Sequence, residues 1–156
     1  MSNAYVSALW GADYLLTCAN AGFARVNLHG GGWFLHSGSH WTESLDRNTS
    51  LVLWNAICES ISGFDMYDCK IDQASNLATY FGKRGKQSLL ALINKDQKDI
   101  VVDLPDPLRQ HKVKTEMRLT GPSLNALSGT TLAERKSSVR ASVMVPAYSA
   151  TLLKWQ

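Results

Sequence analysis

The stretch NLATYFGKRGKQSLLALINKD, residues 76–96, decides the fold of the second part of the chain. Two apolar runs flank the turn residues Lys83, Arg84 and Gly85, and neither run has the 3.6-residue period of a helix. Short apolar runs joined by a turn that contains glycine are typical of a β-hairpin. The sequence therefore predicts two antiparallel strands here, with the basic cluster at the hairpin tip.

The same pattern continues to residue 156. No helical period persists after Gly63, and turn residues such as those of 95–97 and 120–122 separate short apolar runs. Short strands at this spacing favour an antiparallel β-sandwich. The further runs are KDIVVDL (98–104), KVKTEMRL (112–119), ASVMVP (141–146) and SATLLKW (149–155).

The first part of the chain has a different character. Apolar residues recur at helical spacing over 3–21, and Gly22 suits the position after a helix end. FARVNLH, residues 23–29, reads as a strand, and a second helix is expected from about residue 50 to Gly63. We therefore expect an α+β protein with helix–strand–helix over 1–62 and a β-sandwich over 63–156.

Composition excludes several classes of function. The 156 residues are 45% hydrophobic and 19% charged, which is enough to form a core. The longest apolar runs, such as Leu89–Ile93, are far shorter than the roughly 20 residues of a membrane span. The start has no basic signal-peptide region, so we expect a cytoplasmic chain with no membrane partner. The three cysteines form no CxxC motif and read as free thiols in a reducing compartment.

The charge distribution gives no sign of a nucleic-acid partner. The net charge of +3 comes from basic residues dispersed along the second part of the chain, with one cluster at 83–86. No aromatic residues interleave with that cluster, as they do in nucleic-acid-binding surfaces. We therefore expect no nucleic-acid binding.

The stretch GFARVNLHGGGWFLHSGSHW, residues 22–41, contains three histidines and three consecutive glycines. His36 and His40 would lie on one face of a helix and bind zinc there, but Gly38 and its glycine and serine neighbours argue against a helix. We expect no metal and no other cofactor, with His36 and His40 as the alternative metal ligands. No GxSxG motif marks a nucleophilic serine, and the glycines do not open a dinucleotide-binding motif.

Several of these segments resemble glycoside hydrolase family 79, the β-glucuronidase and heparanase-like enzymes. SNAYVSALWGADYLLTCANAGFARVNLHGGG, residues 2–32, resembles the penultimate helix and last strand of that family's catalytic barrel. The hairpin stretch 76–96, MRLTGPSLNALSGTTL (117–132) and VMVPAYSATLLKW (143–155) look like its C-terminal β-sandwich. The resemblance implies that 1–62 is the end of a (β/α)8 barrel and that 63–156 is the sandwich domain.

The resemblance also implies what the chain lacks. A retaining glycosidase needs two carboxylates about 5 Å apart. In this group of families they follow the fourth and seventh barrel strands, and no position here matches either motif. The chain is therefore expected to be a truncated glycoside hydrolase-like protein with no catalytic residues and no glycosidase activity alone.

In the parent enzymes, a strand end like RVNLHGGG would lie at the mouth of the barrel, where barrel active sites form. Asn27, His29, Gly30 and Gly31 would then contact the sugar. The alternative is that these residues only hydrogen-bond within the top layer of the barrel.

A non-catalytic function is the second hypothesis: a carbohydrate-binding or assembly module built on the β-sandwich. Sandwiches usually bind sugars on exposed aromatic platforms, whereas most aromatic residues after Gly63 occupy strand positions where burial is the default. A lone strand at 23–29 would also leave its ladder unpaired on both edges. We therefore expect a homo-oligomer, or an upstream barrel segment that completes the sheet.

Overall fold

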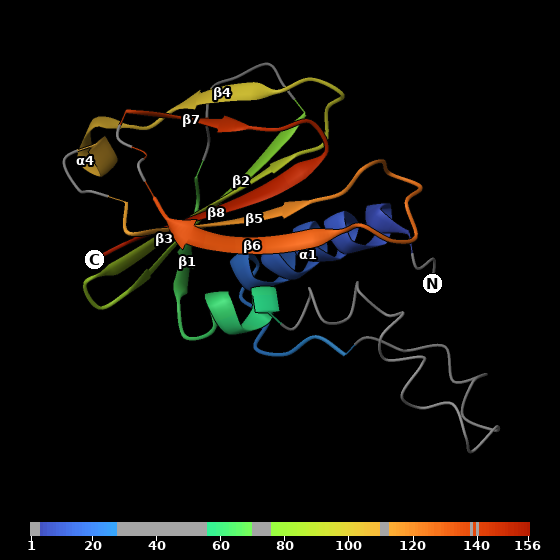
Figure 1. Cartoon of the computed structure of the whole chain (residues 1–156). Helices are drawn as coiled ribbons and strands as arrows, with labels where there is room; N and C mark the ends of the chain where they lie inside the picture. The colour runs from blue at the N-terminus through green and yellow to red at the C-terminus, as the bar shows by residue number, and fades with distance from the viewer. Residues whose placement is uncertain (1–3, 28–55, 70–75, 110–112, 138, 140) are drawn as a thin grey trace.

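The structure is a computed structural model that describes residues 4–27, 56–69, 76–109, 113–137, 139 and 141–156. It has three layers (Figure 1). Helix α1 (Tyr5–Asn20) lies against one face of a six-stranded sheet, and a two-stranded sheet covers part of the other face. The expected α+β class with antiparallel sheets is confirmed. No helix in the described part of the chain is both long enough and apolar enough to cross a membrane.

The larger sheet has the strand order β1-β2-β3-β8-β5-β6, and every neighbouring pair is antiparallel. Its strands are β1 (Asp65–Tyr67), β2 (Leu77–Arg84), β3 (Gln87–Asn94), β8 (Ser149–Trp155), β5 (Thr115–Thr120) and β6 (Thr131–Lys136). The smaller sheet pairs β4 (Ile100–Asp103) with β7 (Ser142–Val145). The short helix α4 (Asp106–Arg109) follows β4.

The predicted hairpin over 76–96 is confirmed as β2 and β3. Their register runs from Leu77 opposite Asn94 to Arg84 opposite Gln87, and Gly85 in the turn has a φ of 58°. A positive φ at the first central residue is what a two-residue hairpin turn needs. The register fixes which side chains of the two strands share a face of the sheet.

Strand β3 is apolar at consecutive positions because it is buried on both faces. Leu89, Ala91 and Ile93 belong to the core shared with α1. Leu90 and Leu92 belong to the core shared with β4 and β7. Side chains alternate along a strand, so two different cores on opposite faces need a continuous apolar run instead of an alternating one.

Helix α1 begins and ends at backbone hydrogen bonds. At its start the N–H groups of Tyr5 and Val6 donate to the carbonyl oxygens of Ala126 and Leu124 at 2.8 and 2.9 Å, so a distant loop caps the helix. At its end Gly22 has a φ of 81°, as the sequence predicted for the residue after the helix.

One predicted strand is not formed over the part of it that the structure describes. Residues 23–27, the described part of the strand expected over 23–29, have no ladder partner in the described chain, and the Phe23 side chain is 65% exposed. The apolar composition is strand-like, but β1 and β6 form the edges of the large sheet. The second helix is confirmed over its described part, 56–61, and is followed by Gly63 with a φ of 74°.

Candidate functional site

Of the site residues predicted from the sequence, only Asn27 lies in the described part of the chain. Asn27 is exposed. His29, Gly30 and Gly31 lie outside the described residues, as do the alternative metal ligands His36 and His40. In the ranges that the structure describes, no three histidine, cysteine, aspartate or glutamate side chains form a cluster that would hold a metal ion.

The two glutamates of the sandwich do not form a catalytic pair. Glu116 of β5 lies opposite Arg135 of β6, and the next pair along the ladder is Met117 with Glu134. Because consecutive residues of a strand point to opposite faces, Glu116 and Glu134 lie on opposite sides of the sheet. They therefore cannot act together on one glycosidic bond.

The carboxylate of Glu116 is buried and forms ion pairs that stabilise the fold. Its side chain is 2% exposed and forms ion pairs with Arg118 and Arg135, the latter at 3.2 Å. Arg118 also donates a hydrogen bond of 2.9 Å to the carbonyl oxygen of Met144 in β7. The buried carboxylate thus orients an arginine that ties the large sheet to the small one.

A groove lies where the small sheet ends and the large sheet continues. It consists of two adjoining pockets, an inner one of about 250 Å³ and an outer one of about 350 Å³, which share Cys69, Pro105 and Leu108. We call it the α4 groove. Two strands and a short helix cannot cover six strands, so the face of β1 and β2 stays partly open beside α4.

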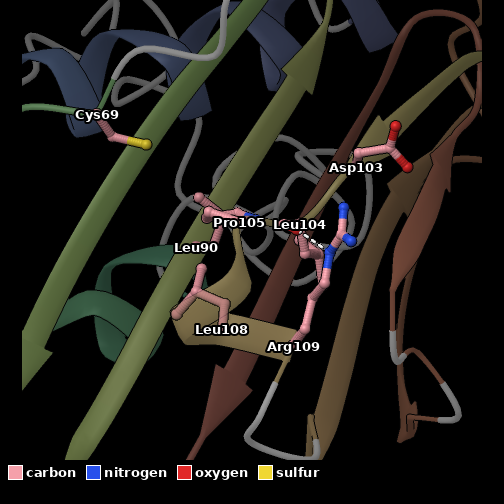
Figure 2. A pocket seen from close by; sticks show the side chains of 7 residues that line it. All are labelled: Cys69, Leu90, Asp103, Leu104, Pro105, Leu108 and Arg109. Atoms are coloured by element: carbon pink, nitrogen blue, oxygen red, sulfur yellow. Dashed lines mark hydrogen bonds between the residues drawn. The ribbon is translucent and has the colours of Figure 1, made fainter.

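The inner part of the α4 groove is apolar at its base. Leu90 of β3 and Leu108 of α4 line it together, and the Arg109 side chain lies along its wall (Figure 2). The Arg109 guanidinium donates to the carbonyl oxygen of Leu104 and lies 3.6 Å from the carboxylate of Asp106. These contacts hold α4 in place against the end of β4.

Two aromatic side chains lie at the outer part of the groove: Phe81 lines it, and Tyr67 lies beside Phe81 at its edge. Tyr67 of β1 lies directly opposite Phe81 of β2, with ring centroids 6.3 Å apart and ring planes tilted by 52°. Tyr67 is 48% exposed. The Lys83 ammonium is 6.0 Å from the centroid of the Tyr67 ring and 5.8 Å from that of Phe81. Phe81 and Lys83 line the outer pocket with Asp68 and Ser88.

The α4 groove has an apolar lining with one thiol, Cys69. Its thiol, Cys69, has a pKa that burial raises, although a hydrogen bond with the Thr79 side chain opposes that effect. A thiol with a raised pKa stays protonated near neutral pH and is a poor nucleophile. An apolar lining with a few polar groups at the rim is typical of small-molecule sites.

A second exposed apolar feature lies on α1. Val6, Trp10 and Tyr14 follow one another at four-residue spacing and are 40%, 53% and 39% exposed. The Trp10 and Tyr14 rings stack, with centroids 5.1 Å apart and planes within 11° of parallel. We call these three residues the outer stripe of α1. The opposite face of the helix packs on the large sheet.

Hydrogen bonds fix the helix that carries this stripe. The Tyr80 hydroxyl of β2 lies 2.7 Å from a carboxylate oxygen of Asp13 and 2.8 Å from the Thr17 hydroxyl. The Lys95 ammonium pairs with the other Asp13 oxygen at 3.2 Å. Asp13, the only charged residue of α1, is therefore used to attach the helix to the hairpin.

The sequence did not predict the groove, because it depends on which face of the sheet each residue of β2 occupies. Tyr80 and Phe81 are adjacent in the sequence, and only the register decides that Tyr80 faces α1 while Phe81 faces the groove. The three-residue strand β1, which carries Tyr67, was not expected at all. The signal that could have found it is the alternation of residues 77–83 combined with a neighbouring edge strand.

No protein-family model matches the sequence, and no curated protein matches it. Solved structures are similar to it in fold. A xylanase of glycoside hydrolase family 30, subfamily 8, from Clostridium acetobutylicum has a TM-score of 0.63 at 13% identity, covering 100% of this chain and 40% of the xylanase. A β-porphyranase of family 86 from Bacteroides plebeius has a TM-score of 0.49 at 19% identity, covering 58% of this chain and 16% of that enzyme.

A family 51 α-L-arabinofuranosidase from Thermotoga petrophila has a TM-score of 0.46 at 19% identity, covering 55% of this chain and 20% of the enzyme. The chain thus spans between 16% and 40% of the length of these three enzymes. At such low identity the likeness shows the fold alone. It rests on the family 30 xylanase, whose TM-score of 0.63 is the highest of the three. The expected glycoside hydrolase-like fold is confirmed, while the closer resemblance to family 79 stays a prediction.

Proposed function

We propose that this chain acts as the non-catalytic sandwich part of a glycoside hydrolase of the family 79 type and has no glycosidase activity by itself. The observation that carries the proposal is the fold likeness of the complete chain to 40% of a family 30 xylanase. The motifs of the hairpin and the closing strand support the finer assignment to family 79. The chemistry would then belong to a barrel that supplies both carboxylates.

The outer stripe of α1 supports a docking role. A helix that is apolar on all sides is normally buried on all sides. The inner face of α1 is covered by the large sheet, whereas Trp10 remains 53% exposed. We propose that the barrel packs on this stripe. Residues 1–62 and 63–156 would then differ in evolutionary origin but fold together, because α1 and the large sheet share one core.

The first test of this proposal is an activity measurement. The purified chain is incubated with aryl β-glucuronides and with xylan, and we expect no hydrolysis above the background of a mock preparation. Glu59→Gln and Glu134→Gln serve as controls, because these are the two described glutamates besides Glu116, and both are exposed. Turnover that disappears in either variant would identify a catalytic residue and contradict the proposal.

A second test concerns the gene. Sequencing the region upstream of the first codon should find an in-frame or adjacent barrel with glutamates after its fourth and seventh strands. A neighbourhood without any barrel-coding segment would contradict the proposed role and favour an independent binding or assembly module.

A further inference from the structure

We propose that the α4 groove binds a neutral pyranose oligosaccharide, with one sugar ring packed against Tyr67 and Phe81. This inference deepens the proposed function, because an accessory domain that holds the polysaccharide would keep substrate near the barrel. It rests on the position of the groove, the exposure of its aromatic residues and the balance of its charges.

The groove exists because the two-stranded sheet covers only part of the six-stranded sheet, and it is not a packing defect. The core on this face of the large sheet is formed mainly from β3, β8, β4 and β7. Tyr67 and Phe81 lie on the same face, in register with Leu90, but beyond the cover of the small sheet. The outer pocket of about 350 Å³ is within the range of about 300–1,000 Å³ that is typical of ligand sites.

The aromatic side chains suit the apolar face of a sugar ring. Tyr67 is a strand residue with nearly half of its surface in water, although large aromatic side chains are usually buried in a sandwich. Its ring is tilted by 52° to that of Phe81, so the two rings do not stack on each other. Burying the C–H groups of a pyranose on these rings would remove apolar surface of both partners from water.

The polar groups of the groove suit hydroxyl groups. Lys83 donates hydrogen bonds, Asp68 accepts them and Ser88 does both, and all three line the outer pocket next to Phe81. A few convergent polar groups around an apolar surface orient a ligand and give specificity. A sugar presents this combination, with hydroxyl groups around its edge and C–H groups on its faces.

The charges favour a neutral ligand over an acidic one. The described lining of the two pockets holds two carboxylates, Asp68 and Asp103, and two cations, Lys83 and Arg109. A balanced lining creates no net positive field that would attract a polyanion. Binding should therefore depend little on ionic strength.

The experiment is an NMR titration of the ¹⁵N-labelled chain with xylohexaose and, separately, with cellohexaose, up to about 20 mM to cover weak affinity. We expect saturable shifts of amides in 65–69, 81–88 and 104–109 with at least one of the two ligands. Tyr67→Ala should weaken that binding by about fivefold, because an aromatic contact of this kind is worth about 1 kcal/mol. The matched control is Trp10→Ala, which removes an exposed aromatic ring outside the groove and should leave the affinity unchanged.

A glucuronic acid-substituted xylo-oligosaccharide tests the charge argument and should bind no more tightly than the neutral form. Four results would overturn the inference: no shifts with either neutral sugar, shifts confined to α1, equal affinity in Tyr67→Ala and wild type, or clear preference for the acidic sugar. The titration needs neither catalysis nor a barrel. Its failure would therefore leave the docking role standing, and a missing barrel gene would leave sugar binding standing.

Discussion

At the scale of single residues, Tyr80 connects the titration of one hydroxyl to the attachment of α1. The Tyr80 side chain is 9% exposed and contacts both Asp13 and Thr17. Burial raises the pKa of Tyr80 to about 12, and the neighbouring Asp13 carboxylate acts in the same direction, while the hydrogen bond with Thr17 opposes them. The folded protein therefore favours the neutral phenol more strongly than the unfolded chain does.

This preference predicts a loss of stability at alkaline pH. The unfolded chain releases the Tyr80 proton near pH 10, whereas the folded protein holds it to about pH 12. The contribution is therefore fully present below pH 10 and is lost as the pH rises from about 10 to 12. Urea denaturation at several pH values in this window should show the free energy of unfolding falling more steeply in wild type than in Tyr80→Phe. Tyr5, whose pKa burial also raises, remains in both proteins, so the variant keeps part of the slope. Equal slopes would contradict the role of Tyr80.

At the scale of elements, the attachment of α1 depends on a close approach between the helix and the loop after β5. Tyr5 is 1% exposed, and its hydroxyl hydrogen bonds to the carbonyl oxygens of Leu119 and Tyr148. Gly121 lies against its ring, where an added Cβ would be 2.5 Å from the nearest ring carbon. The absence of a side chain at Gly121 is what allows the ring to enter.

Gly121→Ala should therefore destabilise the protein by about 1–3 kcal/mol, the usual cost of overpacking a well-packed core. Hydrogen exchange should show the loss first in the amides of α1, because the added methyl group displaces Tyr5. Trp10→Ala leaves the Tyr5 contact intact and removes only the ring stacked on Tyr14, so it should cost about 0.5–1.5 kcal/mol without a preferential loss of protection around Tyr5. A Gly121→Ala protein as stable as wild type, with unchanged exchange in α1, would show that the loop moves aside without cost.

At the scale of the molecule, the large sheet covers one face of α1, and the opposite apolar face remains in contact with water. The expectation of a homo-oligomer began from unpaired edges and apolar helix faces. The large sheet covers the inner face of α1, so the outer stripe is the apolar face of this helix that is left for association. Contiguous exposed apolar surface of this kind drives association.

We expect the isolated chain to form a two-fold dimer through the outer stripe, in the absence of a barrel. Light scattering over a range of concentrations should show the molecular mass rising from monomer to dimer. Trp10→Glu should abolish this rise, because it places a charge in the contact, while Tyr67→Ala should leave it unchanged. A monomer at every concentration would refute the prediction.

The sequence was a good guide to the central strands and a poor one to the edges. The runs that became β2, β3, β4, β5, β7 and β8 are apolar and bounded by turn residues, so local chemistry and burial agree. Strand β6, TLAERK, was missed because its last four side chains are exposed and either small or charged, as suits an edge that must not pair with other chains. At residues 23–27 the sequence predicted a strand that is absent. The composition there is typical of a strand, but a strand needs a neighbour with which to hydrogen bond.

The candidate site was less predictable than the fold. The α4 groove combines side chains from β2, β3, β4, α4 and the residues that follow β1, which come together only once the register and the size of the small sheet are known. The Glu116 cluster has the same origin, because its two arginines come from different strands. The resemblance to family 79 implies that no glutamate of this chain matches that family's two catalytic motifs, and this stays a prediction.

The position of β8 has a consequence for how the protein folds. Strand β8 is the last along the chain of the eight strands in the described residues, yet it lies between β3 and β5. The β2–β3 hairpin can form from local contacts, but it stays separate from β5 and β6 until β8 joins them. Contacts between residues far apart in sequence form slowly. During synthesis the Leu89–Ile93 edge of β3 therefore stays unpaired until residues 149–155 have emerged, and an unpaired apolar edge is a site at which chains aggregate.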